Sequence, residues 1–154
     1  MARIVTAQMG TGTWTIHAKR IRNVACRQYA EEFHNIAKKA GFPIIRAFLL
    51  GQAIELYLKA FLFHQGFGET QLKKKFGHNL KRLLDEAIKL GMGTNLHVSS
   101  QLTADVEALN KVYASKALQY FSLLYLLSGP TLPKLDRLFK FADALKRHIG
   151  SLVK

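Results

Sequence analysis

The stretch IIRAFLLGQAIELYLKAFLFHQ, residues 44–65, decides the fold because it is apolar on nearly every side. It contains one Gly and no Pro, and Pro43 just before it suits a first helical turn, where its missing N–H costs nothing. A helix that is hydrophobic all round is a buried helix. The stretch therefore predicts a long central helix against which the rest of the chain packs.

Segments on both sides of this stretch have the spacing of amphipathic helices. Apolar residues recur every three or four positions in residues 16–39, 80–90, 101–113 and 135–149. Gly and Pro separate these segments, and Ser99 or Ser100 is a candidate N-cap for the third of them. We predict an all-α, single-domain bundle of about five helices over residues 16–154, preceded by a flexible arm at residues 1–15.

Three connecting segments have less definite patterns. Lys73, Lys74 and Lys75 are expected to form a basic turn, and residues 91–97 to form a loop. Residues 118–127 are rich in Tyr, Leu and Phe, and periodicity does not decide whether they continue a helix, run extended or wrap a partner.

Composition narrows the class of protein. The chain has 154 residues, of which 49% are hydrophobic and 21% charged, so it is able to bury a core and is not a disordered sequence. Its one cysteine, Cys26, forms no internal disulfide, and no Cys/His spacing typical of a metal site is present. No apolar run is long enough to span a membrane. We expect a cytoplasmic protein without a metal or another cofactor.

The charge is strongly basic, with 23 Lys and Arg against 10 Asp and Glu and a formal net charge of +13. Such an excess favours a polyanionic partner, although a solvated basic surface explains it equally well. Its densest run is the candidate nucleic-acid-binding set Lys73, Lys74, Lys75, Lys81 and Arg82.

Two short motifs carry a resemblance to a known family. The sequence ELYLKA at residues 55–60 is followed by GHNL at residues 77–80 and then by an amphipathic segment. This pattern, within residues 47–87, resembles the HEPN domain family. The resemblance implies a small all-α bundle, commonly a dimer, acting in defence, toxin–antitoxin or RNA-processing systems. Some members of that family are metal-independent ribonucleases, whose signature is an Arg followed, after four to six residues, by a His.

The ribonuclease signature is displaced in this chain. The spacing that fits it joins Arg27 to His34, in the first helical segment instead of the later part of the chain, and no His lies between residues 113 and 120. A histidine that titrates near neutral pH and a guanidinium that binds phosphate would suit RNA cleavage, but two helical turns also place this pair on an ordinary solvated face. His78 is an alternative candidate for the catalytic base.

The polar side chains of the two motifs, and Tyr113, also have structural interpretations. Glu55 and Lys59 are spaced for an i to i+4 ion pair, and His78 is placed to bond a helix-end amide or to reach Glu55. Tyr113 is placed either to stack on a base or to pack in the core. Our first hypothesis is a noncatalytic binding module for RNA or for a protein partner, homodimeric through residues 118–127. The second is a metal-independent endoribonuclease.

Overall fold

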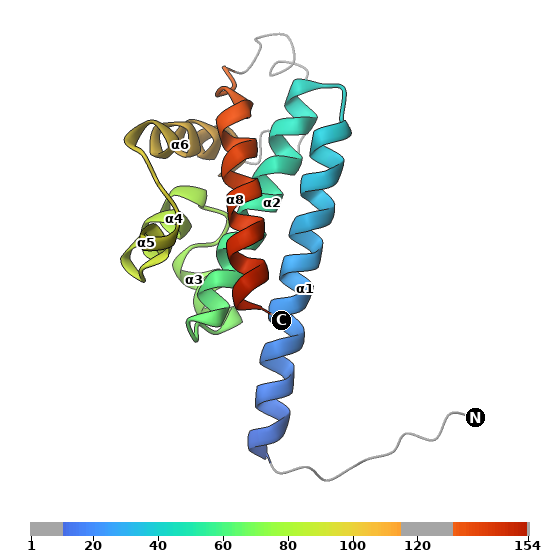
Figure 1. Cartoon of the computed structure of the whole chain (residues 1–154), viewed down its shortest axis with the longest axis vertical. Coiled ribbons are helices and arrows are strands. Elements are labelled where there is room, and N and C mark those ends of the chain that lie inside the picture. The colour runs from blue at the N-terminus through green and yellow to red at the C-terminus, as the bar shows by residue number, and fades with distance from the viewer. Residues whose placement is uncertain (1–10, 115–130, 154) are drawn as a thin grey trace, which may run out of the picture.

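The computed structural model describes residues 11–114 and 131–153, and every regular element in these ranges is a helix. The helices are α1 (Thr11–Lys39), α2 (Pro43–His64), α3 (Glu69–Lys75), α4 (Leu80–Lys89), α5 (Met92–Asn95), α6 (Ser100–Ala114) and α8 (Leu135–Leu152). Figure 1 shows α1, α2 and α8 running along the long axis, with α3 to α6 on one side. The predicted all-α bundle is confirmed.

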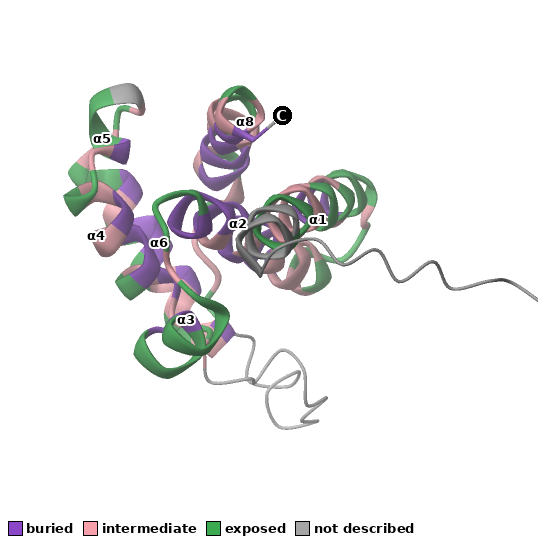
Figure 2. Ribbon diagram, turned by 90° about the horizontal axis from the view of Figure 1, so that it is seen from below, coloured by how far each residue is buried: buried purple, intermediate pink, exposed green. Residues whose placement is uncertain are grey.

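The core lies around α2, as its sequence predicts. Helix α2 packs against α1, α4, α6 and α8, and Figure 2 shows its buried residues at the centre of these neighbours. The fully buried side chains Leu50, Ile54, Leu58 and Leu62 follow one another at four-residue steps along it. The neighbouring helices present apolar stripes to α2, so the bundle has one continuous core.

Three boundaries differ from the sequence prediction. Helix α1 begins at Thr11 instead of residue 16, because residues such as Gly12 and Thr13, although weak helix formers, extend an existing helix without a new nucleation step. Lys73, Lys74 and Lys75 form the last turn of α3 instead of a turn. Helix α3 buries only Leu72, and a single apolar anchor produces no detectable period. For the same reason the one-turn helix α5 lies within the predicted loop at residues 91–97.

The predicted cap of α6 is confirmed at Ser99, whose Oγ accepts a hydrogen bond from the backbone N–H of Leu102 at 3.2 Å. Residues 118–127, for which the sequence left the conformation open, lie outside the described residues. Within the part of the chain that the structure describes, no helix combines the length and the apolar character that crossing a bilayer requires.

Candidate functional site

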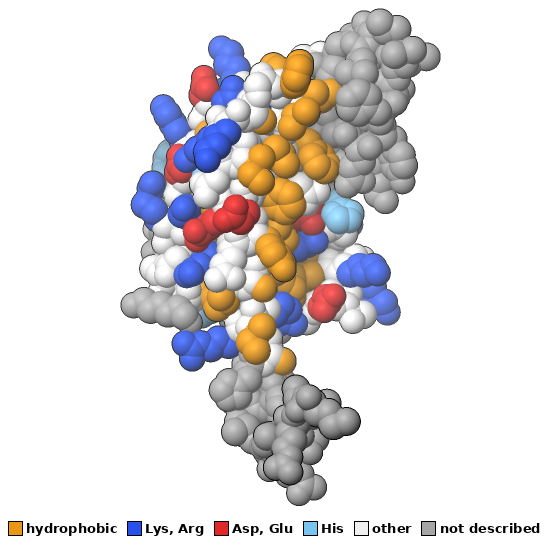
Figure 3. All heavy atoms as spheres, turned by 90° about the vertical axis from the view of Figure 1, so that its right-hand side faces the viewer, with side chains coloured by type: hydrophobic (Ala, Val, Ile, Leu, Met, Phe, Trp, Pro, Cys, Tyr) orange, Lys and Arg blue, Asp and Glu red, His pale blue; other side chains and the backbone are white. Residues whose placement is uncertain are grey.

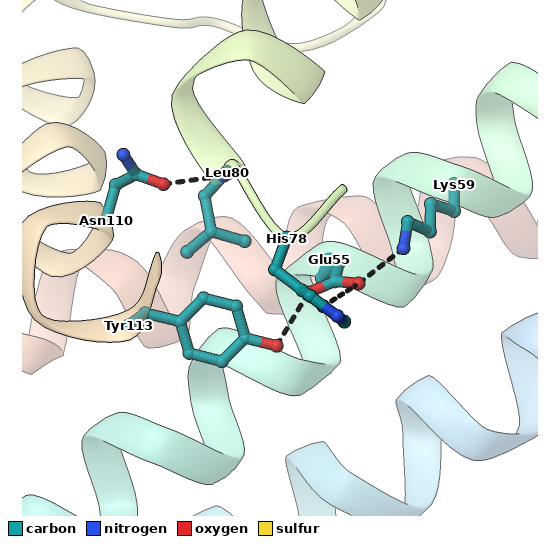
Figure 4. Close-up of polar contacts among 6 residues, drawn as sticks. All are labelled: Glu55, Lys59, His78, Leu80, Asn110 and Tyr113. Atoms are coloured by element: carbon teal, nitrogen blue, oxygen red, sulfur yellow. Dashed lines mark hydrogen bonds and ion pairs between the residues drawn. The ribbon is translucent and has the colours of Figure 1, made fainter. Parts of the chain in front are cut away.

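A buried carboxylate, that of Glu55 on α2, gathers side chains from three parts of the fold (Figure 4). Glu55 is only 3% exposed. Its Oε1 lies 2.5 Å from Nζ of Lys59, and both carboxylate oxygens lie 3.1 Å from Nδ1 of His78. The hydroxyl of Tyr113 on α6 donates to Oε2 at 2.6 Å. We call Glu55, Lys59, His78 and Tyr113 the Glu55 cluster.

Local structure places each member of this cluster. Lys59 follows Glu55 by one helical turn on α2, which confirms the predicted ion pair. His78 lies in the turn between α3 and α4, directly after Gly77, whose φ of +55° belongs to the left-handed region that favours glycine. The side chain of Asn110 accepts a hydrogen bond from the backbone N–H of Leu80 at 2.7 Å and so ties this turn to α6. The predicted contact between His78 and Glu55 is confirmed, and the conformation of Gly77 and the hydrogen bond to Asn110 fix the turn that carries His78.

The electrostatics of the cluster follow from burial. A buried carboxylate is stable only when charged or hydrogen-bonding partners replace water, and Glu55 has three such partners. Burial, followed by the charge and the hydrogen bond of Glu55, raises the pKa of Tyr113 far above its ordinary value, so its hydroxyl remains a donor at neutral pH. The side chain of His78 is 56% exposed, so its ring bridges the buried carboxylate and solvent.

The exposed side of the cluster opens into a groove of about 480 Å³ between α1, α2, α3 and the turn that carries His78. Its cationic side chains are Arg22, Lys59 and Lys73, and Glu69 is the acidic residue that lines it. The apolar part of the lining comes from Ala25, Cys26, Tyr29, Phe63 and Leu72. The groove therefore combines an apolar wall with several positive charges, an arrangement that suits an amphipathic anion.

Two residues of α1 shape the chemistry of this groove. The guanidinium of Arg22 lies over the ring of Phe63, 3.9 Å from its centroid. Burial raises the pKa of the Cys26 thiol, although the positive charges of Arg22 and Lys59 act in the opposite direction. Cys26 is therefore present mainly as an uncharged thiol and is not set up as a nucleophile.

The predicted basic run divides into paired and unpaired residues. Lys75 forms an ion pair with Glu86 at 2.9 Å, and Lys81 contacts both carboxylate oxygens of Asp85 at 2.6 Å. Among the described residues, no acidic side chain pairs with Lys73, Lys74 or Arg82, and Lys73 lines the groove. Within this basic run, Lys73 is therefore the residue that brings an unpaired positive charge to the groove.

Arg27 and His34 are engaged in separate contacts. Nη1 of Arg27 donates to the backbone oxygen of Val153 at 2.6 Å, near the end of α8. His34 is 1% exposed and stacks on Phe139, with 6.0 Å between ring centroids. Burial is the main cause that lowers the pKa of His34. A buried imidazole is not accessible to a substrate, so the structure does not assemble this pair into an open site.

Among the groove residues that the sequence reasoning did not single out are Arg22 and Tyr29. Both lie on α1, and their exposure depends on which face of α1 packs against α2. Figure 3 views the molecule from the side of α1 and shows hydrophobic side chains in a band along this face. The only sequence signal for Arg22 and Tyr29 was their spacing of two helical turns, which residues of an ordinary amphipathic helix also show. Tyr113, by contrast, is 4% exposed and belongs to the core.

No family model matches this chain, and no curated protein and no solved structure matches it. The geometry of the groove and of the Glu55 cluster is therefore the basis for assigning a function.

Proposed function

We propose that this protein is a noncatalytic, HEPN-like helical module that binds RNA through the groove between α1, α2 and α3. The observation that carries the proposal is the meeting of Arg22 and Lys73 with the exposed ring of His78 around an apolar wall. Phosphate oxygens bind Lys and Arg side chains, whereas sugar and base surfaces favour apolar walls. One groove with both kinds of surface fits a nucleotide chain better than it fits a purely apolar peptide.

The charge outside the groove supports the same ligand. Lys74 follows Lys73 on α3 and lines a hollow that shares Lys73 and Glu69 with the groove, so a backbone leaving the groove on this side meets a further positive charge. The net charge of +13 attracts polyanions over a longer range, at a strength that falls with salt. The role in defence, toxin–antitoxin or RNA-processing systems follows from the HEPN resemblance and is part of the proposal, as is a homodimer through residues 118–127.

The noncatalytic part of the proposal rests on Arg27 and His34. One side chain is held by the backbone near the end of α8, and the other is buried among aromatic rings. A general base must reach the proton that it abstracts, and His34 faces the core.

A second candidate function, metal-independent RNA cleavage, is favoured by one observation at His78. The Glu55 carboxylate contacts its Nδ1, which orients the ring as carboxylates orient catalytic histidines and leaves Nε2 for a substrate. In this reaction Nε2 would take the proton of the ribose 2′-hydroxyl. The 2′-oxygen would then attack the adjacent phosphorus, forming a 2′,3′-cyclic phosphate, and the departing 5′-oxygen would take up a proton.

Binding is tested by fluorescence anisotropy of a labelled RNA over a range of salt concentrations. Lys73→Ala is expected to weaken binding and to reduce the slope of log K against log salt by about 1, as the loss of one phosphate contact requires. Lys111→Ala, which removes the same charge from an exposed position on α6, is the matched control and is expected to leave the slope unchanged. Equal effects of the two substitutions would contradict a site in the groove.

Occupancy of the groove has an independent probe in Cys26, the single cysteine of the chain and a lining residue. Saturating RNA is expected to slow the reaction of this thiol with a maleimide, and unchanged labelling in the presence of bound RNA would place the RNA elsewhere.

Cleavage is tested with the same RNA in EDTA, with wild type, His78→Ala and His34→Ala and with folding checked by circular dichroism. Binding without cleavage supports the noncatalytic module. Cleavage that is lost in folded His78→Ala supports the second candidate, and the absence of any RNA binding contradicts both and leaves a protein partner as the alternative.

A further inference from the structure

Tyr29 stands out among the residues of the groove because its side chain is accessible. It is 63% exposed, and in the described part of the chain it has no hydrogen bond, ion pair or ring contact. A single exposed aromatic residue is common on protein surfaces. This ring borders a groove that also contains Arg22 and Lys73, so a ligand held by their charges would meet an aromatic surface that no other described side chain covers.

A second flat surface faces the same groove. The Arg22 guanidinium lies over the Phe63 ring and holds a delocalised plane in place, while its Nη2 is 3.5 Å from the backbone oxygen of Phe67. Nucleobases stack on tyrosine rings and on guanidinium planes, and every base has such a face regardless of its sequence. Tyr29 and Arg22 therefore provide stacking surfaces beside the cations that would bind phosphate.

The size of the groove favours an unpaired nucleotide. Its volume of about 480 Å³ lies within the range of about 300–1,000 Å³ that is common for small-ligand pockets. In a duplex the bases are paired and stacked inside the helix, so their faces do not reach a side chain outside it. A single strand is able to turn one base outward and to leave its phosphate at the rim.

We infer that the groove accepts one unpaired nucleotide of RNA, with its base stacked on Tyr29 and its phosphate directed toward Lys73 and the exposed ring of His78. The inference rests on the proposed function and adds the form of RNA that is bound, which is single-stranded. Base stacking gives the selection of single strands, and the cations give the affinity that depends on salt.

The experiment compares a labelled 12-nucleotide single strand with its duplex by fluorescence anisotropy, using wild type, Tyr29→Ala, Tyr29→Phe and the control Phe42→Ala. Tyr29→Ala is expected to bind the single strand about tenfold more weakly than wild type, because it loses one base–aromatic stack. Tyr29→Phe keeps the ring and is expected to bind like wild type. Phe42, an aromatic residue that is 71% exposed and is not part of the groove lining, is expected to be replaceable without effect.

The outcomes separate the inference from the proposed function. Weaker single-strand binding by Tyr29→Ala, with Tyr29→Phe and Phe42→Ala unchanged and the duplex bound less tightly than the single strand, supports the inference. Unchanged binding by Tyr29→Ala, or duplex binding as tight as that of the single strand, overturns it. If Lys73→Ala still weakens binding in that case, the RNA-binding proposal stands without the stacking. If wild type binds neither RNA, both fail.

Discussion

Substitution of Gly51 by alanine has opposite expected effects on stability, depending on whether packing against the Glu55 cluster or helix propensity dominates. Gly51 is buried inside α2, where glycine is about 1 kcal/mol less favourable than alanine in a free helix. Propensity alone therefore predicts that Gly51→Ala stabilises the protein. The structure predicts the opposite, because a Cβ at this position would lie 2.7 Å from Cδ2 and 3.0 Å from Cε2 of the Tyr113 ring.

The magnitude follows from what must move. Overpacking costs about 1–3 kcal/mol. A shifted Tyr113 ring also loses its 2.6 Å hydrogen bond to the charged Glu55, a type of bond that contributes about 1.5–3 kcal/mol. After the gain of about 1 kcal/mol in helix propensity, Gly51→Ala is expected to lower the free energy of unfolding by about 1.5–5 kcal/mol.

Urea unfolding followed by far-ultraviolet circular dichroism measures this change, and α8 provides a matched control. Gly150 also lies within a helix, but a Cβ there meets nothing within 4 Å, so Gly150→Ala is expected to be neutral or stabilising. In a Tyr113→Ala background, which removes the ring, Gly51→Ala is expected to lose most of its cost. Stabilisation by Gly51→Ala in the wild-type background would refute the reasoning.

Three further predictions concern the titratable groups. Tyr113→Phe is expected to lower the free energy of unfolding by about 1.5–3 kcal/mol in urea titrations, because it leaves Glu55 without its O–H donor, and a change below 0.5 kcal/mol would argue against that bond. Burial lowers the pKa of His34 and His148 in the folded state, so the unfolded chain takes up protons first as the pH falls below about 6.5. The free energy of unfolding is therefore expected to be constant above that pH and to decrease below it, and the decrease is expected to be smaller in His34→Leu. A free energy of unfolding that does not change between pH 7.5 and 5 would contradict the burial of these imidazoles. Cys26, with its raised pKa, is expected to react with a maleimide at pH 7 more slowly than glutathione does, and equal rates would indicate an activated thiol.

Local patterns accounted for the parts of the fold that depend on sequence neighbours. The apolar character of residues 44–65 predicted the central position of α2, and the four-residue step from Glu55 to Lys59 predicted their ion pair. The serine before α6 predicted its cap in the same way. Each of these features is determined within one or two helical turns, where spacing converts directly into geometry.

Tertiary packing determined the rest. The hydroxyl of Tyr113 reaches Glu55 across 58 residues of sequence, and no spacing rule covers such a pair. The burial of His34 and the exposure of Tyr29 depend on which faces of α1 receive α2 and α8, a choice that the pattern of α1 leaves open because both residues lie among mixed neighbours. Spacing alone placed Arg27 and His34 on one face of α1. The packing of α8 buries His34 against Phe139 and binds Arg27 at Val153, so the two side chains do not share an open surface.

The position of α8 has a consequence for how the chain is made. This helix covers α1 and α2, and the contact between Arg27 and Val153 joins residues 126 positions apart. About 70 residues separate the end of α2 from the start of α8, which takes a ribosome about 4–14 seconds to add. During that interval α2, the most hydrophobic of the described helices, lacks one of the helices that cover it. The apolar surface of α2 that α8 covers is therefore exposed until α8 has been translated, and exposed apolar surface of this kind favours aggregation.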